Sequence, residues 1–136
     1  MSEYLVHPIG VVRSPLRHRE EAPRQEHAGA PEALLVLEPR YADALHRVEP
    51  GDELVLLTWF HLSDRDVLQV HPMGDLSIPL TGVFATRSPD RPNPIGLHRV
   101  TVLEVDGTRV RVRDLEAIDG TPILDLKPVL GSVGER

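Results

Sequence analysis

The stretch 96-GLHRVTVLEVDGTRVRVRDL-115 is the part of the sequence that indicates the fold most clearly. Apolar and polar residues alternate over 96–105, the two-residue period of a strand with one buried face. Asp106-Gly107 is a strong signal for a tight hairpin turn. After this turn three apolar residues alternate with three arginines: Val110, Val112 and Leu115 with Arg109, Arg111 and Arg113. We therefore predict an antiparallel hairpin.

Further short strands are predicted on either side of this hairpin. They cover residues 4–13, 33–37, 53–60, 82–86 and 123–126, and most are separated by proline or glycine turns. Residues 39–48 have apolar side chains at helical spacing and predict a short helix, whereas 62–79 is expected to be loop. Strands that recur at short intervals indicate an antiparallel barrel. The prediction is a mainly β, single-domain antiparallel β-barrel with short helices over residues 1–136.

Composition narrows the classes of function. The chain has 136 residues, is 40% hydrophobic and 26% charged, and contains no cysteine, so disulfides and thiolate metal sites are excluded. The seven histidines show no metal-ligand spacing, and no metal site is expected. The longest apolar run, 54–60, is too short for a membrane span. With no signal-peptide pattern at the start, a cytoplasmic location is expected.

The net charge of −6 argues against broad coating of nucleic acid, since phosphate-binding proteins are usually basic. This net charge does not exclude a local basic face. The three arginines of 109–113 could contact phosphates, or they could form a solvated outer face.

The segment 82-GVFATRSPDRPNPIG-96 is a candidate for ligand binding. Three prolines and two bounding glycines restrict its backbone, which lowers the entropy cost of holding a ligand. Arg87 and Arg91 carry guanidinium groups that can pair bidentately with a carboxylate. Asn93 adds a polar side chain nearby. The alternative is a proline-rich turn with solvated arginines.

Three other places carry candidate groups. The turn Asp119-Gly120-Thr121-Pro122 could present backbone groups to an adenine edge, or could be a plain β-turn beside an Asp125–Lys127 ion pair. Gln25, in the long polar loop 16–32, can donate and accept hydrogen bonds, although a solvated loop is the simpler interpretation. His61, after the core candidates Trp59 and Phe60, could act as a general base or be an ordinary hydrogen-bonded histidine.

Together these segments resemble the TrmO family of β-barrel (class VIII) S-adenosylmethionine-dependent methyltransferases. The similarity lies in IGVVRSP at 9–15, PRQ at 23–25, GVFATRSPDRPNPIGL at 82–97 and DGTPILDLKP at 119–128. The resemblance implies a homodimer with its cofactor sites near the subunit interface. It also implies methylation of N6 of threonylcarbamoyladenosine beside the tRNA anticodon.

The resemblance also implies which residues contact S-adenosylmethionine. These are Gln25, Glu26, His27, Phe60, His61, Arg87, Leu97, Asp119, Gly120, Thr121 and Pro122. Candidates for a general base are Asp119, His61 and Tyr41, and the sequence does not choose among them. Arg91, Asn93 and Lys127 are the candidates for substrate binding. Arg87 or Arg91 is expected to pair with a carboxylate of the cofactor or of the threonyl group.

Two other functions compete with methylation of tRNA. The first is a methyltransferase of the same fold acting on a small molecule, suggested by the acidic charge and by the expected lack of the C-terminal domain of longer family members. The second is a non-catalytic module that binds S-adenosylmethionine or RNA.

Overall fold

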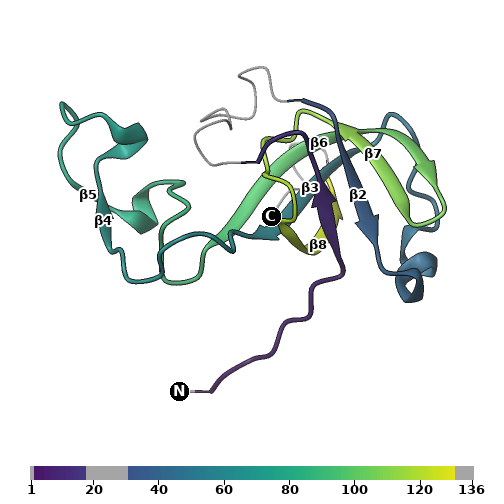
Figure 1. Cartoon of the computed structure of the whole chain (residues 1–136), viewed down its shortest axis with the longest axis horizontal. Helices are drawn as coiled ribbons and strands as arrows, with labels where there is room; N and C mark the ends of the chain where they lie inside the picture. Colours follow the sequence, from purple (N-terminus) through teal and green to yellow (C-terminus); the bar gives the residue numbers. More distant parts are fainter. Residues whose placement is uncertain (1, 18–30, 131–136) are drawn as a thin grey trace.

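Six antiparallel strands close into a barrel in the order β1-β2-β7-β6-β3-β8 (Figure 1). The computed structural model describes residues 2–17 and 31–130. The barrel strands are β1 (Gly10–Arg13), β2 (Ala33–Leu37), β3 (Glu53–Trp59), β6 (Ile95–Asp106), β7 (Arg109–Arg113) and β8 (Pro122–Pro128). The prediction of a mainly β, antiparallel barrel with short helices is confirmed.

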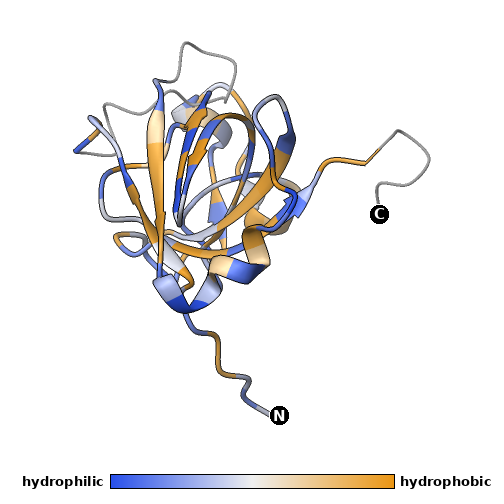
Figure 2. Cartoon of the chain, turned by 90° about the vertical axis from the view of Figure 1, so that its right-hand side faces the viewer, coloured by the Kyte–Doolittle hydropathy of each residue, from blue (hydrophilic) through white to orange (hydrophobic). Residues whose placement is uncertain are grey.

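Alternation along the strands places branched aliphatic side chains inside the barrel. Figure 2 shows hydrophobic and hydrophilic residues following one another along the ribbons. The most buried members of this core include Val12, Leu35, Leu56, Val100, Val102, Val110, Val112, Leu115 and Ile123. Burying each such side chain stabilises the fold by about 1.5–3 kcal/mol before the entropy cost is counted. The core therefore depends on valine, leucine and isoleucine, as the scarcity of aromatic residues requires.

The predicted hairpin around Asp106-Gly107 joins β6 to β7. Asp106 pairs with Arg109, and Gly107 has a φ of 60°, the left-handed conformation that glycine adopts at little cost. The register shifts between Val102 and Glu104, which marks a β-bulge in the longest strand.

Several predicted boundaries were wrong. β1 begins at Gly10 rather than at residue 4, because its pairing with β2 begins at Gly10–Leu37 and its pairing with β8 begins at Gly10–Ile123. Residues 39–48 form only a 3-10 helix, η2 (Pro39–Leu45), without a side-chain cap. Residues 82–86 are not one strand: a two-residue β5 (Thr81–Gly82) passes directly into the 3-10 helix η4 (Val83–Ala85).

Residues 60–94 leave the barrel between β3 and β6 and form a projection that we call the arm (Figure 1). Its base is closed by the amide of Phe60, which donates to the carbonyl of Pro94 at 2.7 Å. Within the arm, β4 (Gln69–Val70) pairs with β5, and η3 (Pro72–Gly74) lies between them. The prediction of loop over 62–79 therefore missed β4 and η3, which are too short to show a period.

Candidate functional site

One open end of the barrel gathers segments that are far apart in the sequence. The register places Thr58 beside both Gly96 and Ile123, and Val11 beside Pro122. The end of β3, the start of β6 and the turn before β8 therefore meet at the same edge. We call this end the rim: residues 58–61, 95–98 and 116–122, with the end of β1. Phe60, Leu97 and the 119–122 turn, which the family resemblance groups together, all lie on it.

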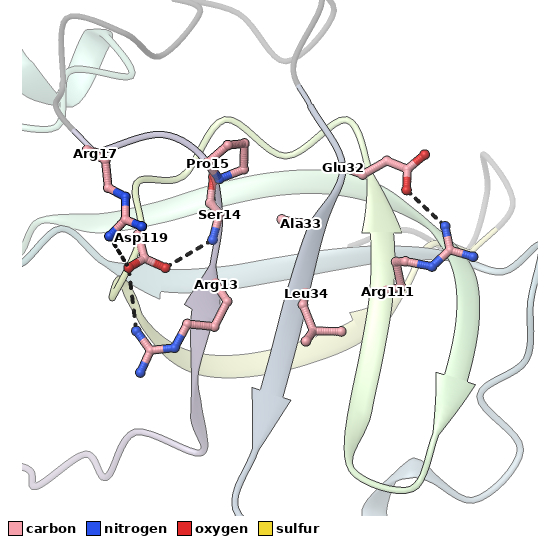
Figure 3. A pocket seen from close by; sticks show the side chains of 9 residues that line it. All are labelled: Arg13, Ser14, Pro15, Arg17, Glu32, Ala33, Leu34, Arg111 and Asp119. Carbon is pink, nitrogen blue, oxygen red and sulfur yellow. Dashed lines mark hydrogen bonds and ion pairs between the residues drawn. The ribbon is translucent and has the colours of Figure 1, made fainter.

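Asp119 fastens the rim to the segment that follows β1 (Figure 3). Its Oδ1 accepts a hydrogen bond from the Ser14 amide at 3.1 Å, and its Oδ2 accepts one from Arg17 at 3.2 Å. Arg13 forms a longer ion pair with the same carboxylate at 3.6 Å. The amide of Asp119 also donates to the carbonyl of Leu16 at 2.7 Å. Both oxygens of Asp119 thus already have donors, and the side chain organises the turn.

An open hollow lies beside Asp119. It has a volume of about 670 Å³ and is lined by β1, the start of β2 and Arg111 of β7. Figure 3 shows Arg13, Arg17 and Arg111 at its edges, each with its guanidinium directed at an acid, Asp119 or Glu32. No residue of the arm lines this hollow.

The turn after Asp119 is held by hydrogen bonds to the backbone and has open space beside Gly120. Gly120 has a φ of 86°, and its amide donates to the carbonyl of Val12 at 2.8 Å. Thr121 is buried, and its hydroxyl donates to the carbonyl of Ile118 at 2.7 Å. A Cβ placed on Gly120 would meet no described atom within 4 Å. A flat ligand such as a nucleobase can therefore approach this backbone closely.

Beneath the rim lies a buried polar cluster that the sequence analysis missed. His98 is 2% exposed, and its Nδ1 donates to Oε1 of Glu116 at 2.5 Å. Its Nε2 lies 2.8 Å from the hydroxyl oxygen of Thr58. The alternation of residues 96–105 could have indicated that His98 is buried, because His98 lies on the same face of the strand as the buried Val100 and Val102.

The rim also carries three of the predicted cofactor contacts. Phe60 is half-buried and meets the His98 ring edge to face, with 5.8 Å between centroids. Leu97 is 47% exposed and points away from the core. His61 is exposed at the base of the arm. The three residues thus offer an apolar surface and an accessible imidazole.

Arg91 and Arg87 have different environments in the arm. The guanidinium of Arg91 donates to three backbone carbonyls, those of Val83, Thr86 and Ser88, at 3.0–3.1 Å. Arg91 therefore holds the proline-rich turn in shape. Arg87 is exposed, and within residues 31–130 its side chain has no hydrogen bond or ion pair. Its guanidinium thus has no partner among the described residues and can pair with an anionic ligand.

The remaining predicted residues are placed differently. Asn93 is exposed on the arm and accepts a hydrogen bond from Arg65 at 3.0 Å. Lys127 forms the predicted ion pair with Asp125 at 3.0 Å. Lys127 and Tyr41 lie at the end of the barrel opposite the rim, because Lys127 pairs with Val55 near the start of β3 and Tyr41 belongs to η2. Gln25, Glu26 and His27 lie outside the described residues.

The fold and the rim define a small closed β-barrel with a projecting arm. Known proteins with similar sequences and structures identify the family to which this barrel belongs. A family profile described as "tRNA-methyltransferase O N-terminal domain" matches residues 11–134, and the chain belongs to this family. It is 44% identical over 126 residues to a "Probable S-adenosyl-L-methionine-binding protein" of Methanothermobacter thermautotrophicus, covering 93% of this chain and 90% of that one. It is 43% identical over 123 residues to an "S-adenosyl-L-methionine-binding protein" of Archaeoglobus fulgidus, covering 90% and 87%.

Solved structures agree with this assignment. The crystal structure of TrmO from Pseudomonas aeruginosa superposes with a TM-score of 0.79 at 32% identity over 98% of this chain. This chain spans 59% of that protein's length. In residues 2–17 and 31–130, none of the helices has the length and apolar character needed to cross a membrane.

Proposed function

We propose that the chain binds S-adenosylmethionine at the rim and transfers its methyl group to N6 of threonylcarbamoyladenosine in tRNA. The observation that carries this proposal is the meeting of Phe60, Leu97 and the 119–122 turn on one end of the barrel. The names of the two archaeal relatives support S-adenosylmethionine as the cofactor, and the name of the family supports tRNA as the substrate.

The residues of the rim and arm suit the parts of such a cofactor. The open side of Gly120 admits an adenine, and Phe60 and Leu97 offer apolar contact. The free guanidinium of Arg87 matches the methionyl carboxylate. When bound, the cofactor supplies an electrophilic methyl group on a sulfonium. The main task of the protein is then to align the acceptor nitrogen in line with the methyl–sulfur bond.

Among the three base candidates, the surroundings favour His61. Asp119 already accepts two hydrogen bonds and forms an ion pair with Arg13, and Tyr41 lies at the opposite end of the barrel. His61 is exposed at the base of the arm, beside Phe60. We therefore propose that His61 accepts the proton released from N6. A His61→Gln variant should lose about 10²–10⁴-fold in methyl transfer, far more than it loses in cofactor affinity.

A homodimer is part of the proposal, because the arm carries an apolar surface without cover from the described residues. Six large apolar side chains of the arm are at least half exposed: Leu62, Leu68, Met73, Leu76, Leu80 and Phe84. That many exposed apolar side chains on one projection favour an interaction site there. The arm of a second copy would cover it and could bring a second Arg87 towards the rim. Light scattering should report a mass near twice 15.1 kDa.

Transfer to a small acceptor is the second candidate, and the pairing of the arginines favours it. Arg99 pairs with Glu53, Arg111 with Glu32, and Arg113 with Asp114. These guanidinium groups have acidic partners that phosphates would have to displace, and the net charge is −6. A non-catalytic binding module remains the third possibility.

Two measurements separate these functions. Purified chain should release S-adenosylhomocysteine when given tRNA that carries threonylcarbamoyladenosine, and none when given tRNA without that modification. Mass spectrometry of tRNA nucleosides from a deletion strain should show loss of the methylated nucleoside. Turnover with the free nucleoside but not with tRNA would favour the small acceptor. Cofactor binding without turnover on any acceptor would favour the binding module.

A further inference from the structure

The buried cluster beneath the rim links three segments that meet there. Glu116 belongs to the stretch between β7 and β8, His98 to β6, and Thr58 to β3. A carboxylate can only accept, so Nδ1 of His98 carries the hydrogen of the 2.5 Å contact. In a neutral ring, Nε2 is then the acceptor for the hydroxyl hydrogen of Thr58 at 2.8 Å. The chain of hydrogen bonds runs Thr58 to His98 to Glu116.

Phe60 rests directly on this cluster. Its ring meets that of His98 at an interplanar angle of 82°. A Cβ built on Gly96 would fall 2.5 Å from Cζ of Phe60, 2.8 Å from Nε2 of His98 and closer still to the Thr58 hydroxyl. The three side chains therefore converge on the bare backbone of Gly96. The position of the Phe60 ring depends on the orientation of His98.

Glu116 connects the same cluster to the other half of the rim. It lies three residues before Asp119, between the buried Leu115 and Ala117. Its side chain is 18% exposed, and Oε1 is committed to His98. Holding Glu116 in place also holds the start of the segment that leads into the 119–122 turn.

We infer that His98 is a positioning residue for the cofactor: it locks Phe60 and the 116–122 segment in one fixed arrangement. This inference rests on the proposed function, because it assumes that the rim binds S-adenosylmethionine. His98 is not expected to touch the cofactor. Both ring nitrogens of His98 have hydrogen-bond partners, while Oε2 of Glu116 has none among the described residues. A buried ring that is held at both nitrogens favours a single arrangement of the groups that contact a ligand.

The test compares cofactor affinity among variants of the full chain by titration calorimetry with S-adenosylmethionine. His98→Phe keeps a ring beneath Phe60 but removes both hydrogen bonds, and should weaken binding about tenfold or more. Thr58→Val removes one hydroxyl at almost constant volume, and should weaken binding by about threefold. Glu116→Gln keeps an acceptor for Nδ1, and should stay within about twofold of the parent chain.

Val102→Ala is the matched control, because Val102 is buried on the same strand but two inward positions further from the rim. It should lower the unfolding temperature yet leave cofactor affinity unchanged. If His98→Phe does not fold, the question is decided by comparing the cofactor affinities of Thr58→Val and Val102→Ala. Affinity that falls only in step with unfolding temperature, equally in the control, would overturn the inference. A parent chain that binds no S-adenosylmethionine would instead overturn the proposed function.

Discussion

Gly96→Ala is expected to damage both stability and cofactor binding, because the added methyl has no room. A Cβ at this position would lie 2.4 Å from Oγ1 of Thr58 and 2.5 Å from Cζ of Phe60. Ordinary van der Waals separations are roughly 3.5–4.0 Å, so each of these groups must move by about 1 Å. Overpacking of this kind costs about 1–3 kcal/mol. Since Phe60 is the group displaced at the rim, S-adenosylmethionine affinity should fall together with stability.

Gly82→Ala provides the control for this experiment. A Cβ on Gly82 would meet nothing within 4 Å, and its φ of −61° suits any residue. Urea unfolding followed by circular dichroism should place Gly96→Ala below the parent chain and Gly82→Ala within about 0.5 kcal/mol of it. Calorimetric titration should then show weaker cofactor binding for Gly96→Ala alone. Equal stability and equal affinity for the two variants would refute the packing described at the rim.

Three further variants test other parts of the structure. Leu35→Ala should lower the free energy of unfolding by about 2–5 kcal/mol in a urea titration, because Leu35 is fully buried; a loss below 1 kcal/mol would contradict its place in the core. Arg91→Lys should speed proteolysis within the arm while the barrel stays folded, since one ammonium cannot replace a fork that binds three carbonyls; an unchanged digestion pattern would exclude that role. Phe84→Asp should shift the chain from dimer to monomer in light scattering, because Phe84 is 83% exposed on the arm; an intact dimer would place the interface elsewhere.

The barrel strands could be predicted because their signals are local. Residues 96–115 combine two-residue alternation with an Asp-Gly turn, and the structure has strands and a turn there. The extent of β1 could not be predicted in this way. Residues 4–9 have a strand-like composition, but the pairings of β1 with β2 and with β8 both begin at Gly10. How far two strands stay paired is a property of the whole sheet.

The site was only partly predictable for a related reason. The turn 119–122 was singled out in the sequence itself and Phe60 only through the family resemblance, and the register brings both to the rim. The different roles of Arg87 and Arg91 could not be predicted from their spacing, because they depend on which of the two guanidinium groups donates to the carbonyls of the turn. The His98–Glu116 contact joins a residue of β6 to one in the stretch between β7 and β8, and only the closed barrel shows that they meet.

Hydrogen–deuterium exchange of the full chain, with and without saturating S-adenosylmethionine, tests the location of the cofactor most directly. We expect slower exchange in peptides covering 58–61, 95–98 and 116–122, and unchanged exchange in η2 at the opposite end of the barrel. Protection confined to η2 and the end of β8, with the rim unaffected, would contradict the account.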